Sequence, residues 1–274
     1  MRFDTEKEAQ LYALKVTSKH ATEADLRRNI TDYRRYQELH SNDPEERVHW
    51  RKQEEANIEY LNSEQFQSGK YHIGIDELIL DVIEFRAIVY SFSVVELTSN
   101  PFEKFTFHRQ WLAGGTYKVF ASYGKLLSGH KDDQSLKNVW NNVSSFIGNT
   151  ALSSNQEVAD LTEFIVSIKN NSSKAFKFRN KAIAHNEQQP KVTWEDLDNE
   201  LMVLCRVWDL ISRWCSIGII APYATDHEAF SGLEPFVSSS ELIELKKARR
   251  KYIKQVCKWC KEEYKPNKQF KSDS

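Results

Sequence analysis

The chain has 274 residues, a formal net charge of −1 and 28% charged residues, so it lacks the general basic coat of a non-specific nucleic-acid binder. With 9 Gly and 6 Pro, it has few of the turn residues that a many-stranded β fold requires, which favours helices. No segment approaches the roughly 18 consecutive apolar residues of a membrane span, and residues 1–8 are unlike a signal peptide. The four cysteines are too sparse for a disulfide framework and indicate reduced thiols in the cytoplasm.

Residues 1–70 are predicted to form a charged N-terminal helical extension. The apolar residues here are spaced as thin helical stripes, at Leu26, Ile30, Tyr33, Ile58, Tyr60 and Leu61. Such stripes favour an arm that packs on a neighbouring segment or subunit over an independent core. Pro44 follows Asn42 and Asp43 and divides the arm into at least two helices, because Pro is tolerated only at a helix start.

Residues 71–220 are predicted to form the main helical bundle. Helices are expected at 75–97, 105–127, 136–147, 157–186 (with an interruption near 170–173) and 193–214. Gly114 and Gly115 indicate either a close approach between helices or a break. Thr193 and Asp196 have the spacing of a capping box. Residues 221–274 then form a connection and a basic C-terminal helix, expected at 238–264.

Residues 174–185 are the most informative segment. On an ideal helix, at about 100° per residue, one broad arc is apolar and contains Ala175, Phe176, Phe178, Ala182 and Ile183. Arg179 falls inside this arc, and a separate basic stripe contains Lys174, Lys177, Lys181 and His185. An Arg on an apolar face stays charged and therefore needs a partner. That partner is either a carboxylate on an adjacent helix or an anion in a cleft.

Arg179, Asn180 and His185 resemble the motif of the HEPN superfamily, in which Arg and a polar residue precede His, with four to six residues between Arg and His. Five residues intervene here. The surrounding sequence is most similar to the abortive-infection branch of bacterial defence proteins. The resemblance is specific over about ten residues, and over residues 75–220 it is only architectural. Arg34 or Arg35 with His40 is a second match, which we reject because it lies in a charged, exposed-looking helix outside the bundle.

The resemblance implies an all-α, HEPN-like helical bundle that acts as an endoribonuclease without metal or cofactor. In this chemistry the RNA 2′-hydroxyl attacks the adjacent phosphate and leaves a 2′,3′-cyclic end. His185 would be the general base or acid, since imidazole titrates near neutral pH. Arg179 would hold the phosphate and offset the developing charge, and Asn180 would bind the phosphate or orient His185. The implied role is a toxin or an anti-phage abortive-infection protein, with tRNA as a family-level substrate and an antitoxin or other regulatory partner.

The spacing of the motif also predicts a homodimer. Residues six apart lie about 120° apart around a straight helix, so one helix does not easily direct Arg179 and His185 at one phosphate. Either the helix frays near His185, or two helices build a composite cleft across a dimer. HEPN ribonucleases resemble the second arrangement. Glu187 stands where a sub-branch silenced by nucleotidyl transfer has Tyr, so control at that position is not expected.

The candidate RNA-binding residues are basic residues of the motif helix and of the C-terminal helix: Lys174, Lys177, Lys181, Arg249, Arg250 and Lys254. In the C-terminal segment, basic residues are interleaved with Tyr252, Trp259, Tyr264 and Phe270. This pattern suits phosphate contact with base stacking, or alternatively a solvated helix whose apolar stripe packs on the bundle. Cys257 and Cys260 form a CxxC without a second pair at zinc-ribbon spacing, so no metal site is expected.

A non-catalytic all-α dimeric scaffold is the alternative function, and an RNA-binding HEPN module that does not cut is its near relative. In the scaffold, Arg179 is a structural ion-pair partner and His185 is a helix-end residue. The two classes make different demands on the structure. An enzyme requires the two motifs to face each other across a two-fold cleft open to solvent, whereas a scaffold requires Arg179 to be fully paired with an acidic side chain and closed off.

Overall fold

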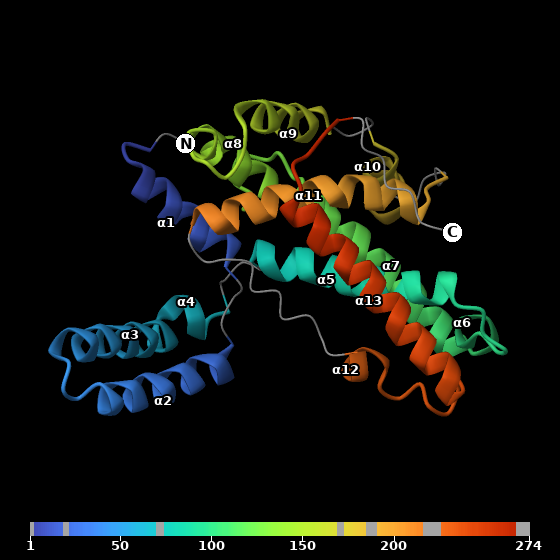
Figure 1. Cartoon of the computed structure of the whole chain (residues 1–274), viewed down its shortest axis with the longest axis horizontal. Coiled ribbons are helices and arrows are strands. Elements are labelled where there is room, and N and C mark those ends of the chain that lie inside the picture. The colour runs from blue at the N-terminus through green and yellow to red at the C-terminus, as the bar shows by residue number, and fades with distance from the viewer. Residues whose placement is uncertain are drawn as a thin grey trace. The chain divides into compact units, whose positions relative to one another are not determined.

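The computed structural model describes residues 3–18, 22–69, 74–168, 173–184, 191–215 and 226–266, and every regular element in these ranges is a helix (Figure 1). The predicted all-α class is therefore confirmed. No helix in these ranges combines the length and the apolar character that crossing a membrane requires. In chain order the helices are α1 (Glu6–Thr17), α2 (Glu23–Leu39), α3 (Pro44–Asn62), α4 (Glu64–Gln67), α5 (Ile75–Val94), α6 (Pro101–Lys104), α7 (Thr106–Leu126), α8 (Leu136–Ile147), α9 (Asn155–Ser167), α10 (Lys174–Phe178), the π-helix η1 (Arg179–Ala184), α11 (Trp194–Trp214), α12 (Asp226–Phe230) and α13 (Ser239–Lys261).

The chain divides into two compact units, a larger one of residues 1–18 and 75–274 and a smaller one of residues 19–74. The predicted extension begins at residue 1, whereas α1 belongs to the larger unit. The buried face of α1 joins the main core, and Trp214 Nε1 donates a 2.8 Å hydrogen bond to Glu6. That face consists mainly of Ala9, Ala13 and Val16, so its small side chains give a weak apolar signal in the sequence.

The smaller unit contains α2, α3 and α4. The predicted break before Pro44 is confirmed, because Asp43 Oδ1 accepts hydrogen bonds from the backbone N–H groups of Glu45 (3.1 Å) and Glu46 (3.2 Å). α2 and α3 pack along each other, and their apolar stripes meet in a small core. Its buried members are Leu26, Ile30 and Leu61, with Ile58, Tyr60 and Phe66 at its edge.

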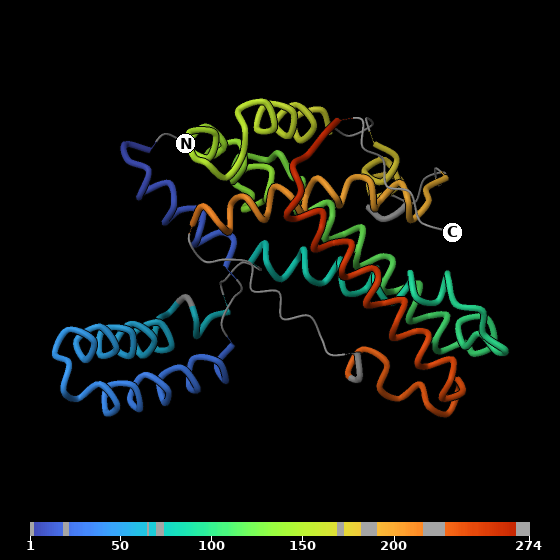
Figure 2. Tube along the Cα trace, viewed as in Figure 1, coloured from blue at the N-terminus to red at the C-terminus, as the bar shows by residue number. Residues whose placement is uncertain are grey.

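α5 runs through the core of the larger unit and packs against α1, α7 and α13. Figure 2 shows α13 crossing α5, and α13 also packs on α11. Two tryptophans are fully buried in this core, Trp140 on α8 and Trp208 on α11. Each indole N–H has an acceptor, as buried Trp requires: Trp140 donates to Thr162 at 3.0 Å and Trp208 to Asp76 at 2.6 Å.

Three buried arginines join helices of the larger unit, and each bonds to a carboxylate. Arg86 on α5 donates two hydrogen bonds to Asp198 on α11, at 2.9 and 2.6 Å. Arg206 on α11 donates to both carboxylate oxygens of Glu157 on α9, at 2.7 and 2.9 Å. Arg249 on α13 donates to Glu84 on α5 at 2.7 Å. Such pairing is what burial of a guanidinium demands, because Arg keeps its charge in the interior.

The two adjacent glycines of α7 leave the helix unbroken and have different surroundings. A Cβ atom at Gly115 would meet the ring of Phe85, with ring atom Cδ2 only 2.7 Å away. Nothing lies within 4 Å of a Cβ atom at Gly114. The close approach of two helices, one of the two predicted alternatives, is therefore confirmed at Gly115, where α5 and α7 pack together.

Local capping signals locate several helix starts correctly. Thr193 and Asp196 form the predicted capping box at the start of α11, where Asp196 N donates to Thr193 Oγ1 at 3.1 Å. The long helix predicted at 157–186 is interrupted as expected: α9 ends at Ser167, and α10 begins at Lys174 after the N-cap residue Ser173. Residues 169–172 lie outside the described ranges.

Candidate functional site

The motif segment consists of the short helix α10 followed by the π-helix η1. Ser173 starts α10 by accepting a 2.9 Å hydrogen bond from Phe176 N, and Ala175 and Phe176 are its buried residues. Arg179, the first motif residue, is the first residue of η1. π-helical turns are rare and occur frequently at functional sites. The π-helix therefore coincides with the segment that the sequence analysis singles out.

Aromatic contacts hold this segment against α7. The ring of Phe178 lies 4.7 Å from that of Phe120, and the ring of Phe176 lies 6.2 Å from that of Tyr123. Trp194, at the start of α11, stacks on Phe120 from 6.2 Å. The rings on α7 thus give the motif segment an apolar support, and the polar end of Arg179 extends along the same helix.

Gly124 on α7 leaves the room that Arg179 occupies. A Cβ atom at Gly124 would lie 2.9 Å from both Cδ and Cζ of Arg179, well inside van der Waals contact. Glycine at this position therefore lets the Arg179 side chain lie directly on the α7 backbone. Gly124 was not among the predicted site residues. Its significance depends on which side chain packs on it, and the sequence does not contain that information.

The hydrogen-bond partners of Arg179 distinguish it from the three buried arginines. Its Nη1 donates a 2.9 Å hydrogen bond to Oδ1 of Asn180, the next motif residue. Across the described ranges it forms no ion pair with an acidic side chain, and it is only half-buried. Because a guanidinium has five N–H donors, Arg179 retains donors for an external anion. Among the described residues, Arg179 therefore lacks the acidic partner that a purely structural arginine would need.

The predicted basic stripe does not act as one unit. Lys174 forms a 2.9 Å ion pair with Asp196, the capping residue of α11, so it helps to attach α10 to α11. Lys177 is exposed and has no acidic partner in the described part of the chain, while Lys181 is half-buried. Among these lysines, Lys177 is the one most available for an anionic ligand.

His185, the predicted acid or base, lies outside the described residues, as does Glu187. The structure therefore gives the surroundings of Arg179 and Asn180 and leaves the distance between Arg179 and His185 undetermined. Since η1 is a π-helix, the angular offset of an ideal α-helix does not apply to residues 179–184.

The predicted RNA-binding residues of α13 differ sharply in exposure. Arg249 is 3% exposed and bonded to Glu84, so the prediction that it contacts RNA is wrong. Arg250 and Lys254 are exposed, away from the buried side of the helix. The cause is helix register: residue 249 falls on the stripe of α13 that faces α5, and adjacent residues point about 100° apart.

The cysteines of the CxxC motif belong to the packing of α13. Cys260 is buried, Cys257 is half-buried and both are free thiols. Burial raises the pKa of Cys257 above the usual thiol value, with the nearby Cys260 adding to the shift. No group of three potential metal-ligating side chains occurs in the described part of the chain.

A buried acid that the sequence analysis did not identify lies on α11. Glu200 is 8% exposed, and its Oε2 has no hydrogen-bond partner among the described residues. Burial raises the pKa of this carboxyl to about 8, so the group holds its proton at neutral pH. The only sequence signal for it is an acidic residue next to the apolar Leu201 in a long apolar helix.

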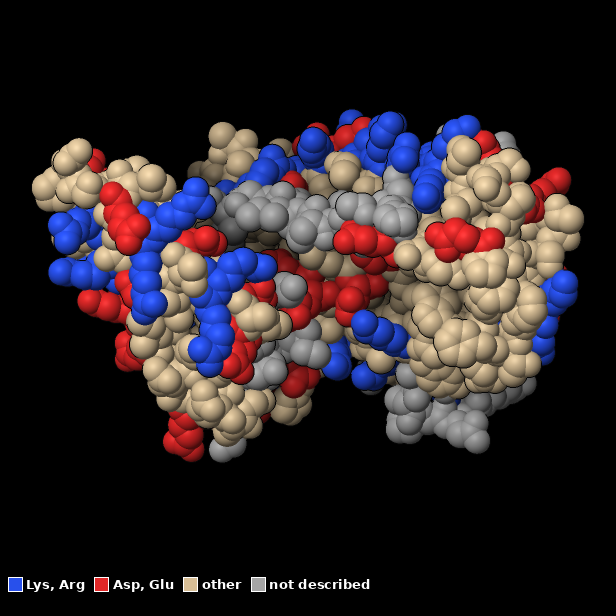
Figure 3. Space-filling view, turned by 90° about the horizontal axis from the view of Figure 1, so that it is seen from below, with Lys and Arg blue, Asp and Glu red and all other residues tan. Residues whose placement is uncertain are grey.

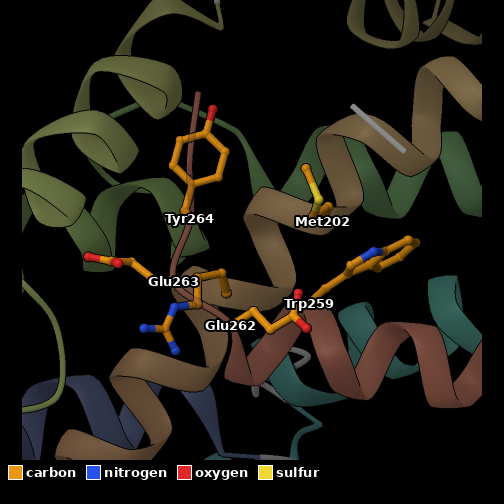
Figure 4. Close-up of a pocket in the computed structure, with 6 residues that line it drawn as sticks. Met202, Trp259, Glu262, Glu263 and Tyr264 are labelled. Atoms are coloured by element: carbon orange, nitrogen blue, oxygen red, sulfur yellow. The ribbon is translucent and has the colours of Figure 1, made fainter. Parts of the chain in front are cut away.

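Two further surface features do not extend the site. A small hollow near the end of α13 is lined by Met202, Arg206, Trp259, Glu262, Glu263 and Tyr264 (Figure 4). Its volume of about 10 Å³ is close to the space that one water molecule requires, so it is too small for a ligand.

Figure 3 shows basic and acidic side chains interspersed on one face, as the near-zero net charge predicts.

No family model, curated protein or solved structure matches the chain. The resemblance to the HEPN superfamily therefore depends on the motif residues themselves, and the site has to be argued from its own contacts.

Proposed function

We propose that the chain is a metal-independent endoribonuclease of the HEPN type. The observation that carries this proposal is the environment of Arg179. Three other arginines of the larger unit are buried and bonded to carboxylates, whereas Arg179 is half-exposed and bonds to its motif neighbour Asn180. A half-exposed guanidinium without a carboxylate partner in the described ranges suits a phosphate ligand, because Arg binds phosphate oxygens through paired N–H groups.

The proposed reaction is internal transesterification of RNA. His185 accepts the proton of the 2′-hydroxyl, and the 2′-oxygen attacks the adjacent phosphorus. The bond to the 5′-oxygen breaks, that oxygen takes a proton from an imidazolium such as the one formed at His185 and leaves as a hydroxyl, and a 2′,3′-cyclic phosphate remains. Arg179 donates hydrogen bonds to the non-bridging oxygens, where negative charge increases in the transition state. Asn180 holds the guanidinium in orientation through their 2.9 Å hydrogen bond.

The proposal includes a homodimer in which the two motifs share one cleft. In its support, α7 exposes a large aromatic side chain near the motif, since Tyr117 is 50% exposed. Tyr117 and Gly124 are seven residues apart and so lie on nearly the same side of α7. A second copy on this face would lie beside Arg179. A role in abortive infection, with RNA such as tRNA as the target, rests on the motif resemblance.

The test is cleavage of total bacterial RNA by the purified protein in EDTA, compared with Arg179→Ala and His185→Ala. We expect discrete fragments with cyclic-phosphate ends from the wild type and none from either variant. Arg35→Ala and His40→Ala are the matched controls, because they remove the second, rejected occurrence of the motif spacing. Cleavage lost in these controls, or retained in the first two variants, would contradict the assignment. An intact fold that binds RNA without cutting it would indicate the non-catalytic RNA-binding module.

The shared cleft has a separate test in mixtures of Arg179→Ala and His185→Ala. If Arg179 of one protomer acts with His185 of the other, each mixed dimer regains one intact site, so re-annealed mixtures recover about a quarter of wild-type activity. No recovery would mean that each protomer uses its own pair.

A further inference from the structure

The outer face of α13 carries an unusual concentration of positive charge. Between Leu245 and Lys261 the helix has no acidic residue, while its basic residues are Lys246, Lys247, Arg249, Arg250, Lys251, Lys254, Lys258 and Lys261. In a chain whose basic and acidic residues nearly balance, 38 against 39, this segment is locally basic. Neighbouring like charges on a helix repel one another, so this arrangement slightly destabilises the helix when no anion is bound.

The inner face of α13 fixes the orientation of this charge. Leu245, Tyr252, Val256 and Trp259 are buried in the larger unit. Tyr252 donates a 2.7 Å hydrogen bond to Asp198, and Arg249 bonds to Glu84. The helix therefore cannot rotate about its axis without breaking buried polar contacts, and its outer side chains keep a fixed direction.

The outward cations form one stripe. Lys247, Arg250, Lys251, Lys254 and Lys258 are exposed, and together with Gln255 they line a surface hollow. Lys247 pairs with Glu244 at 2.7 Å, and the exposed track from Arg250 to Lys258 contains no acidic residue in its sequence. At about 1.5 Å per residue this track is roughly 12 Å long, comparable to three or four successive phosphates of a helical strand.

The aromatic residues of this segment do not accompany the cations. Tyr252 is 1% and Trp259 is 3% exposed, so neither offers a ring to a base. Tyr264 is half-buried against the ring of Phe164, 6.2 Å away. Phe270 lies outside the described residues. Of the two predicted alternatives, the apolar stripe of α13 packs on the bundle, and the exposed track offers positive charge without base stacking.

We infer that the outer face of α13 binds the sugar–phosphate backbone of RNA, without base recognition. The choice of RNA as the polyanion rests on the proposed function. A membrane surface is the competing polyanion, but helices that bind membranes insert an apolar face among the headgroups. The apolar face of α13 is already buried in the protein. Binding through Lys and Arg to phosphates alone is independent of sequence and strongly salt-dependent.

The test uses the Arg179→Ala protein, so that RNA is not consumed, and measures fluorescence anisotropy with labelled U and A oligonucleotides of about 20 residues. The track variant carries Arg250→Gln, Lys251→Gln, Lys254→Gln and Lys258→Gln. The matched control carries Lys15→Gln, Lys104→Gln, Arg109→Gln and Lys131→Gln, four exposed cations elsewhere on the larger unit. Both variants lose four positive charges, so a difference in their affinity for RNA depends on where the charges lie and not on the net charge.

We expect both oligonucleotides to bind the parent protein equally, with the logarithm of affinity falling as salt rises. Each single-strand phosphate contact contributes about 0.7 to the slope, so the track variant should lose about 3 from it and bind at least tenfold more weakly at low salt. Equal behaviour of the track and control variants would overturn the inference. So would binding to phosphatidylserine vesicles without binding to RNA. If RNA binds through the track while wild-type protein never cuts it, the proposed catalysis fails and the α13 assignment stands.

Discussion

Gly124→Ala is the sharpest test of how the motif is supported, because it should separate activity from stability. The added Cβ atom would lie 2.9 Å from Cδ and Cζ of Arg179, whereas carbon atoms in contact are about 3.5–4.0 Å apart. The Arg179 side chain must therefore move by about 1 Å. It is the flexible end of a half-exposed side chain, so the fold tolerates this shift at little cost.

The expected magnitudes follow from these two facts. Replacing Gly by Ala inside a helix stabilises it by about 0.8–1.0 kcal/mol, which raises the melting temperature by roughly 2–4 °C in a domain of this size. A misplacement of about 1 Å in a catalytic group costs on the order of 100-fold in rate. Gly124→Ala should accordingly be at least as stable as the wild type and about 100-fold slower in the proposed RNA cleavage.

Gly114→Ala is the matched control, because it makes the same change in the same helix with nothing within 4 Å of the new Cβ atom. It should be slightly stabilised and fully active. Gly115→Ala should instead lose about 1–3 kcal/mol of stability, since the ring of Phe85 occupies that space. Initial cleavage rates and thermal unfolding midpoints of the three variants test these expected activities and stabilities. If Gly124→Ala cleaves RNA as fast as Gly114→Ala, the contact between Gly124 and Arg179 has no role in the reaction.

Two further predictions concern stability. Arg249→Ala leaves Glu84 in a site only 23% exposed, so it should lower the unfolding free energy by about 2–3 kcal/mol, whereas Arg250→Ala should change it by less than about 0.5. Equal urea midpoints for the two would contradict the register of α13. Burial raises the pKa of Glu200 from 4.5 to about 8, so from about pH 5 to 8 the native state holds a proton that the unfolded state has released. Stability therefore falls as pH rises, by up to about 1.4 kcal/mol per pH unit. Burial also raises the pKa of Asp76 to about 6, which adds to the slope below that pH, so Glu200→Gln should remove most of the slope between about pH 6 and 8. Urea unfolding at several pH values checks it, and an unchanged slope in the variant would show that Glu200 is not the responsible group.

The long helices of residues 75–261 could be located from the amino-acid sequence, because their signals are local, whereas the short helices α6 and α12 and the π-helix η1 were not predicted. Pro44 with its capping Asp43, and the capping box of Thr193 and Asp196, each act within one turn of helix, so the helix starts could be located without knowledge of packing. The apolar arc around Arg179 is equally local, and it identified an arginine whose charge needs a partner. The all-α class followed from the same short-range patterns.

Tertiary structure decided which charged residues are structural. Arg86 and Asp198 are separated by 112 residues along the chain, and Arg249 and Glu84 by 165, so no local pattern relates them. The same holds for Gly124, whose importance comes from Arg179 lying on it. Arg249 and Arg250 are chemically identical neighbours, yet one is buried and one exposed, because a rotation of about 100° separates them on a helix whose orientation is fixed by distant contacts. Local sequence specifies where helices form, and only their packing determines which of their charges remain available to a ligand.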